Sequence, residues 1–115
     1  MSNTIITPEE VESRTDELFV LDIRPAYSFE EEHIEGSRNL PIYDQLQGKN
    51  FIGLDVSTSE IPEDEEIVVV CFSGSTAAIA AERLREHGFD AKQMVGGIAG
   101  WQSTTVGATK TALSA

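Results

Sequence analysis

The stretch "EIVVVCFSGSTAAIAAERLREHGFD", Glu66 to Asp90, determines the fold predicted for this chain. It opens with a run of β-branched residues, which predicts a buried strand over 66–72, and small residues then lead into a helical pattern over 75–90. The residues that recur at the spacing of one helix face are Ala77, Ala80, Ala81 and Leu84. Where the strand gives way to the small residues lies Cys71, and two interpretations of it compete. It is either the last core residue of the strand or a nucleophile at the mouth of a loop.

Weaker signals on both sides extend the same alternation of strand and helix. Thr7 stands three residues before Glu10, with Pro8 between them, which is a capping box and predicts a short helix. Strands are predicted for "LFVLD", residues 18–22, and for "AKQMV", residues 91–95, whereas residues 42–66 predict one short helix and loops. Strands that alternate with helices indicate an α/β domain with a mainly parallel sheet.

Ligands of such sheets bind at the carboxyl ends of the strands, where both Asp22 and Cys71 are predicted to lie. Past the last strand, Gly96 and Gly97 predict a tight turn and Trp101 a core position. We expect the domain to span residues 1–101 and residues 102–115 to form a small, polar tail that is frayed or disordered.

Composition narrows the class of protein further. A chain of 115 residues is expected to form one domain, and a single cysteine excludes an internal disulfide and a multi-cysteine metal site. We therefore expect no metal and no cofactor. The amino-terminal segment has no basic stretch followed by an apolar one, and nowhere do about eighteen apolar residues run together. The expectation is a soluble, cytoplasmic protein that does not contact a membrane.

The charge balance is strongly acidic, with 20 acidic and 8 basic residues. Nucleic acid is a poor partner for such a chain, because phosphate binding needs clustered Lys and Arg. Acidic blocks such as "FEEEHIE" and "PEDEE" are typical of solvated faces. Adaptation to high salt is the alternative, because a large negative charge costs little when the Debye length is about 3 Å.

The residues after Cys71 favour the nucleophile. Gly74 allows the backbone to curl tightly, so that Ser75 or Thr76 can cap a helix whose free N–H groups point back at the sulfur. Such a cradle stabilises a thiolate. The loop contains no cation, so activation has to come from backbone groups.

With these residues in view, the chain resembles the rhodanese-like single-domain sulfurtransferases. The resemblance is carried by "VLDIR" (20–24), "HIEGSRNLP" (33–41), "VVVCFSGST" (68–76) and "MVGGIAGW" (94–101), which come in the family's order. It implies a doubly wound sheet of about five strands with helices on both faces. It also implies that Cys71 attacks the outer sulfur of a donor, becomes a persulfide and passes that sulfur to a thiophilic acceptor.

The resemblance also implies roles for other residues. The anion-binding loop is formed by Cys71 with Phe72, Ser73, Gly74, Ser75 and Thr76. Asp22 orders nearby loops and Arg24 pairs with an acid; the alternative is an ordinary loop cap and a surface ion pair. The family commonly has Glu at position 28, where this chain has Ser28, so the acid that pairs with Arg24 is left open. His33 is expected to be structural.

Donors and partners follow from the same residues. The expected donor is a small sulfane compound or a persulfidated protein, and the expected acceptor is a thiol, cyanide or a protein. Thiosulfate, a dianion, meets little help from a loop without a cation. A cysteine-dependent phosphatase would need arginine at position 77, which is Ala77. The remaining alternative is a rhodanese-like binding or redox-sensing module without turnover.

Overall fold

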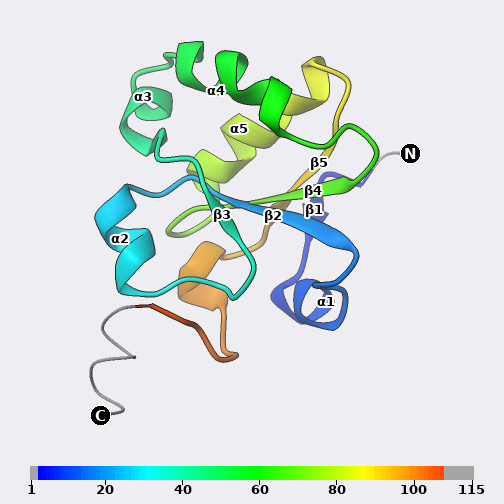
Figure 1. Ribbon diagram of the computed structural model, residues 1–115, viewed down its shortest axis with the longest axis vertical. Helices are drawn as coiled ribbons and strands as arrows, with labels where there is room; N and C mark the ends of the chain where they lie inside the picture. The colour runs from blue at the N-terminus through cyan, green and yellow to red at the C-terminus, as the bar shows by residue number, and fades with distance from the viewer. Residues whose placement is uncertain (1–2, 108–115) are drawn as a thin grey trace.

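The computed structural model describes residues 3–107, and within them strands and helices alternate along the chain (Figure 1). Their bounds are β1 (Ile5–Ile6), α1 (Pro8–Ser13), β2 (Leu18–Asp22), α2 (Ala26–Glu31), β3 (Arg38–Asn39), α3 (Tyr43–Gln47), α4 (Ile52–Ser57), the 3-10 turn η1 (Thr58–Glu60), β4 (Glu66–Val70), α5 (Ser75–Glu86), β5 (Asp90–Met94) and the 3-10 turn η2 (Gly97–Gly100). None of these helices is long and apolar enough to cross a membrane.

The five strands form one sheet in the order β1-β5-β4-β2-β3, and every pairing is parallel. The connections from β2 and β4 lead to opposite edges of the sheet. A parallel sheet has its crevice where neighbouring strands diverge in this way, which here is between the carboxyl ends of β2 and β4. The prediction of an α/β domain with a five-stranded parallel sheet is confirmed.

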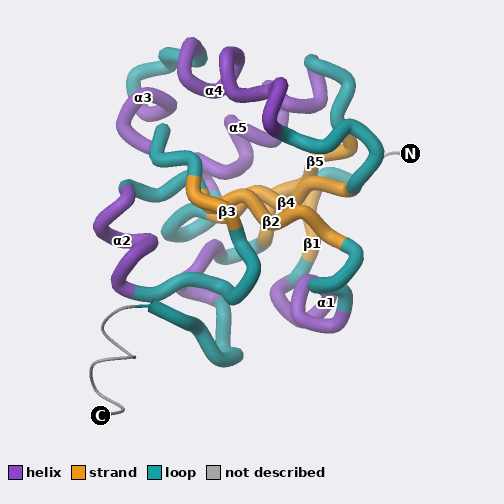
Figure 2. The backbone as a smooth tube through the Cα atoms, in the orientation of Figure 1, coloured by secondary structure: helices purple, strands orange, loops and turns teal. Residues whose placement is uncertain are grey.

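Both faces of the sheet are covered, as Figure 2 shows. Helices α3, α4 and α5 lie on one face, and α1 and η2 lie on the other with the segment that follows α2. Alternate residues of β4 serve the two cores: Ile67 and Val69 face α5 together with Cys71, whereas Val68 and Val70 face α1 and η2. Because both faces of β4 are buried, its sequence is a continuous apolar run.

Helix α5 buries the predicted face, formed by Ala77, Ala80, Ala81 and Leu84. It ends in a Schellman motif at Gly88, which has a φ of +95°. The amide of Phe89 donates to the carbonyl of Leu84 at 3.1 Å, and the amide of Gly88 donates to that of Arg85 at 3.0 Å. Small alanines bring the helix close to the sheet, so its first turn lies directly over the end of β4.

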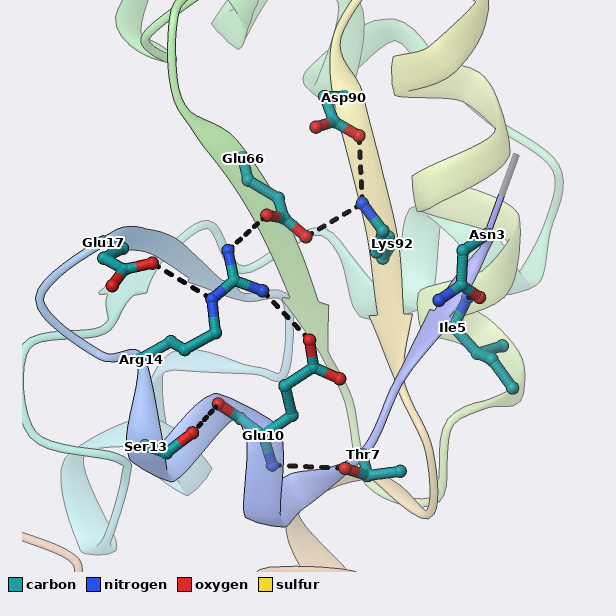
Figure 3. A network of polar contacts seen from close by, with 10 residues as sticks. All are labelled: Asn3, Ile5, Thr7, Glu10, Ser13, Arg14, Glu17, Glu66, Asp90 and Lys92. Carbon is teal, nitrogen blue, oxygen red and sulfur yellow. Dashed lines mark hydrogen bonds and ion pairs between the residues drawn. The ribbon is translucent and has the colours of Figure 1, made fainter. Parts of the chain in front are cut away.

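Ion pairs fasten the opposite end of β4 (Figure 3). Glu66 accepts from Arg14 at 2.7 Å and from Lys92 at 2.8 Å. Burial alone would raise the pKa of Glu66, but the hydrogen bonds from Lys92 and Arg14 outweigh it and hold this pKa below its ordinary value. Thr7 caps α1 by accepting the Glu10 amide at 3.1 Å, while the Glu10 carboxylate binds Arg14. Only the threonine half of the predicted capping box is therefore formed.

The structure adds to the predicted secondary structure in two places. Residues 42–66 contain α3, α4 and η1 where one short helix was expected. Beyond the domain, Val106 exchanges two backbone hydrogen bonds of 2.8 Å with His33, and Thr105 donates to Glu32 at 2.9 Å. Part of the segment expected to be a tail thus contacts the residues that follow α2, through Thr105 and Val106. Residues 108–115 lie outside the described part of the chain.

Candidate active site around Cys71

Cys71 follows the last residue of β4, and its sulfur faces the first turn of α5. The Sγ atom accepts hydrogen bonds from the amides of Gly74 at 3.0 Å and Ala77 at 3.2 Å. The residue is only 1% exposed. Cys71 is thus buried as a core residue would be, and it is also surrounded by N–H donors as a stabilised thiolate requires.

The cradle forms by a different capping arrangement from the one expected. Gly74, with a φ of +111°, is the residue that caps α5, and Ser75 is already the first helical residue. Neither Ser75 nor Thr76 caps the helix with its side chain, so that expectation is wrong. Ala77 is the third residue of α5, and its amide would ordinarily donate to a capping Ser or Asp. Here the sulfur of Cys71 takes that place.

The turn η2 binds the cysteine loop through backbone hydrogen bonds. The amide of Ile98 donates to the carbonyl of Cys71 at 2.8 Å, and the amide of Ala99 donates to that of Phe72 at 3.1 Å. Gly97 makes this approach possible, since it has a φ of +60° and a Cβ there would lie 2.6 Å from the Cys71 carbonyl oxygen. The predicted tight turn at Gly96 and Gly97 is confirmed, and its proximity to the cysteine could not be deduced from the sequence.

The side chains of the loop face different surroundings. Ser73 and Ser75 are exposed, and Phe72 is half-buried. Thr76 is buried, and its hydroxyl accepts from Gln47 Nε2 in α3 at 2.7 Å.

Two glutamines that sequence reasoning missed therefore touch the loop. Besides Gln47, Gln93 in β5 donates from Nε2 to the carbonyl of Gly74 at 3.1 Å. Both are isolated polar residues in elements that pack against the loop, and nothing in their local sequence marks them.

Asp22 and Arg24 form a buried ion pair at the neighbouring strand end. The guanidinium binds the carboxylate through Nε at 3.0 Å and Nη2 at 2.8 Å, and the side chains of Arg24 and Asp22 are 4% and 1% exposed. Arg24 Nη2 also donates to the carbonyl of Glu32 at 2.8 Å. The expected alternative of a surface ion pair is thus wrong, and the acid that pairs with Arg24 is Asp22 itself.

This pair reaches the cysteine loop through Phe72. The Arg24 guanidinium carbon lies 5.8 Å from the centre of the Phe72 ring, which is the range of a cation–π contact. The same ring meets Tyr43 in α3 edge to face, with centroids 4.9 Å apart and planes at 88°. The crevice between β2 and β4 therefore brings Cys71, Phe72, Tyr43 and the Asp22–Arg24 pair together.

His33 lies outside this group. Its Nδ1 is 2.6 Å from the carbonyl of Phe29, and its ring stacks on the Phe29 ring at 3.7 Å. These contacts support the structural role expected for it. Within residues 3–107, no three or more His, Cys, Asp or Glu side chains are grouped so as to hold a metal ion.

Comparison with known proteins identifies the class to which this fold and loop belong. Residues 7–104 match the model of the rhodanese-like domain, and the chain belongs to that family. It is 35% identical over 107 residues to the thiosulfate sulfurtransferase GlpE of Pseudomonas aeruginosa, covering 90% of this chain and 89% of that protein. The crystal structure of a rhodanese-like domain protein from Staphylococcus aureus superimposes with a TM-score of 0.76 at 20% identity, covering 92% of this chain and 99% of that one.

Longer relatives contain a similar segment. The chain is 35% identical over 83 residues to the adenylyltransferase and sulfurtransferase MOCS3-2 of Zea mays. The match covers 71% of this chain but only 17% of that protein. The chain thus spans about a fifth or less of the length of such relatives.

Proposed function

We propose that the protein is a rhodanese-type sulfurtransferase in which Cys71 carries sulfur as a persulfide. The observation that carries this proposal is the pair of amide donors, Gly74 and Ala77, directed at Sγ. A thiolate and the persulfide formed from it are both anions, and backbone N–H groups at the start of a helix stabilise an anion without a metal or a cationic side chain.

The reaction consists of two displacements. The Cys71 thiolate attacks the outer sulfur of the donor, and the bond from that sulfur to the rest of the donor breaks, its electron pair leaving with the donor remnant. In the second step a nucleophilic acceptor, such as a thiol, cyanide or a protein, attacks the terminal sulfur of the persulfide. The sulfur–sulfur bond breaks, and its electrons restore the Cys71 thiolate. The amides of Gly74 and Ala77, which donate to Sγ, support the thiolate at the start and at the end of this cycle.

Phosphoryl transfer, the other chemistry of cysteine loops, fits poorly. Ala77, in the first turn of α5, is fully buried, and this is the position where an arginine would be needed to bind a phosphoryl group. Names of relatives support sulfur transfer, since GlpE proteins of two bacteria are thiosulfate sulfurtransferases.

Intact-protein mass spectrometry tests the proposal. Incubation with a sulfane donor should add the mass of one sulfur atom to the protein, and cyanide or dithiothreitol should remove it. The Cys71→Ser variant should gain nothing, and Ser73→Ala, which changes an exposed loop side chain, should still be loaded. If no sulfane donor loads the folded protein, the proposal is wrong and the binding or redox-sensing module remains.

A further inference from the structure

The route by which a donor reaches Cys71 passes few side chains. Since Cys71 is 1% exposed, a donor has to approach its sulfur across the outer surface of the loop. Gly74 and Thr76 are buried there, so the loop side chains left at the surface are Ser73, Ser75 and Phe72. Two of these are small hydroxyls. Phe72, the residue next to Cys71 in the chain, is the large one, and it supplies the apolar surface of the loop.

The Phe72 ring belongs to a fixed aromatic corner. Its edge-to-face contact with Tyr43, at 4.9 Å, is a favourable geometry for two rings and holds Phe72 against α3. Both residues are half-buried, so each keeps part of its ring surface accessible. An apolar substituent on the donor can therefore pack on a preformed surface, with little ordering of side chains on binding.

Electrostatics at the same place disfavour a doubly charged donor. Arg24 is the cation in contact with Phe72, but Asp22 binds it through two nitrogens, so the pair is neutral as a unit. The loop itself has no charged residue, and the chain carries a formal net charge of -12. A dianion therefore meets general repulsion without a local counter-charge.

We infer that the site selects a sulfane donor with one negative charge and an apolar substituent, an organic thiosulfonate or persulfide, over inorganic thiosulfate. This inference rests on the proposed sulfurtransferase function. For a thiosulfonate the step is Cys71–S⁻ plus R–SO₂–S⁻, giving Cys71–S–S⁻ plus the sulfinate R–SO₂⁻. The bond between the two donor sulfurs breaks, and its electrons leave with the sulfinate, whose R group lies against Phe72.

Three donors separate charge from apolar contact. Benzenethiosulfonate and methanethiosulfonate both carry one charge and differ in the substituent, whereas thiosulfate carries two. The quantity to measure is kcat/KM for cyanide-dependent sulfur transfer. We expect its value for benzenethiosulfonate to exceed that for methanethiosulfonate by about fivefold to tenfold, which corresponds to the free energy of one aromatic contact. Methanethiosulfonate should in turn exceed thiosulfate. Raising the salt concentration from about 0.05 M to about 1 M should reduce the ratio between methanethiosulfonate and thiosulfate, because salt screens the charge effect. The ratio between benzenethiosulfonate and methanethiosulfonate, which carry the same charge, should not change.

Variants locate the effect. Phe72→Ala should remove the preference for the phenyl donor over the methyl donor, and Phe72→Leu, which keeps apolar bulk, should reduce it if the alanine variant does not fold. The matched control is Phe19→Ala. Phe19 is also half-buried, with the Arg38 guanidinium 5.9 Å from its ring, but it lies near the opposite end of β2. Its substitution should leave the donor ratios unchanged.

The outcomes distinguish this inference from the function on which it rests. Failure of all three donors to load Cys71 would refute the sulfurtransferase itself. Sulfur loading with thiosulfate as efficient as benzenethiosulfonate would refute the donor selectivity alone. A phenyl preference that is undiminished in a folded Phe72 variant would also refute it, because the preference would then not come from this ring.

Discussion

Replacing Gly97 by alanine tests whether η2 holds the cysteine loop by close backbone contact. The introduced alanine would have to keep a φ of +60°, and its Cβ would lie 2.6 Å from three backbone atoms: the carbonyl oxygen of Cys71 and the carbonyl carbon and oxygen of Phe72. Backbone atoms on both sides belong to packed elements, so the contact is relieved only if η2 moves away. That movement breaks the hydrogen bonds from Ile98 and Ala99 to the loop.

The expected loss of stability follows from these two effects. A non-glycine residue in the left-handed region costs about 1–2 kcal/mol. Each of the two lost hydrogen bonds contributes about 0.5–1.5 kcal/mol, so Gly97→Ala should lower the free energy of unfolding by about 3 kcal/mol. Gly36 is the matched control, because its φ is +87° and a Cβ there meets nothing within 4 Å. Gly36→Ala should lose only the conformational part, about 1–2 kcal/mol.

Urea denaturation measures both variants against the parent protein. A difference of about 2 kcal/mol between them corresponds to about 1 M in the urea midpoint, well above the error of such measurements. Sulfur loading of Cys71 should be slower in Gly97→Ala and unchanged in Gly36→Ala. If the two variants lose equal stability, close packing of η2 on the loop does not contribute, and the reasoning is refuted.

Two further substitutions test charged groups. Asp22→Asn leaves the Arg24 guanidinium buried without its carboxylate, so it should lower the free energy of unfolding by about 3–5 kcal/mol, as measured by urea denaturation. A loss below about 1 kcal/mol is what an exposed ion pair would give, and it would contradict the idea that this pair is buried. Hydrogen bonds from Arg83 and then His87 hold the pKa of Asp55 below its ordinary 3.8, so its contribution to stability is present above that pH and is lost as the pH falls. The free energy of unfolding of the parent protein should therefore exceed that of Asp55→Asn at pH 7, and the difference should disappear at acid pH. A difference that does not depend on pH would show that the folded protein does not stabilise the Asp55 carboxylate.

Much of the fold was predictable because its signals are local. The apolar run of β4, the alanine face of α5 and the glycine at its end lie in one continuous segment, and each follows from neighbouring residues. The strand β1 was not predicted, because two residues, Ile5 and Ile6, are too few for a periodic pattern. Pairing with β5 across the sheet, and not local propensity, makes this segment a strand.

The sequence predicted the cysteine loop of the site, but not the contacts that other segments make with this loop. A cysteine before small, flexible residues and a helix predicted the amide cradle, although the helix cap depended on the backbone angle of Gly74, which composition alone does not give. The contacts of Gln93 and Gly97 with the loop join segments far apart in sequence. They could be found only once the sheet had placed β5 next to β4.

The hydrogen bonds from η2 to the cysteine loop also have a consequence for the order in which the protein is made. Polypeptides emerge from the ribosome amino-terminal end first, so Cys71 and its helix are exposed before β5 and η2 have been made. During that interval the carbonyls of Cys71 and Phe72 lack the amides of Ile98 and Ala99. Two of the backbone contacts that fix the cysteine loop are therefore supplied only after the loop and its helix have been made.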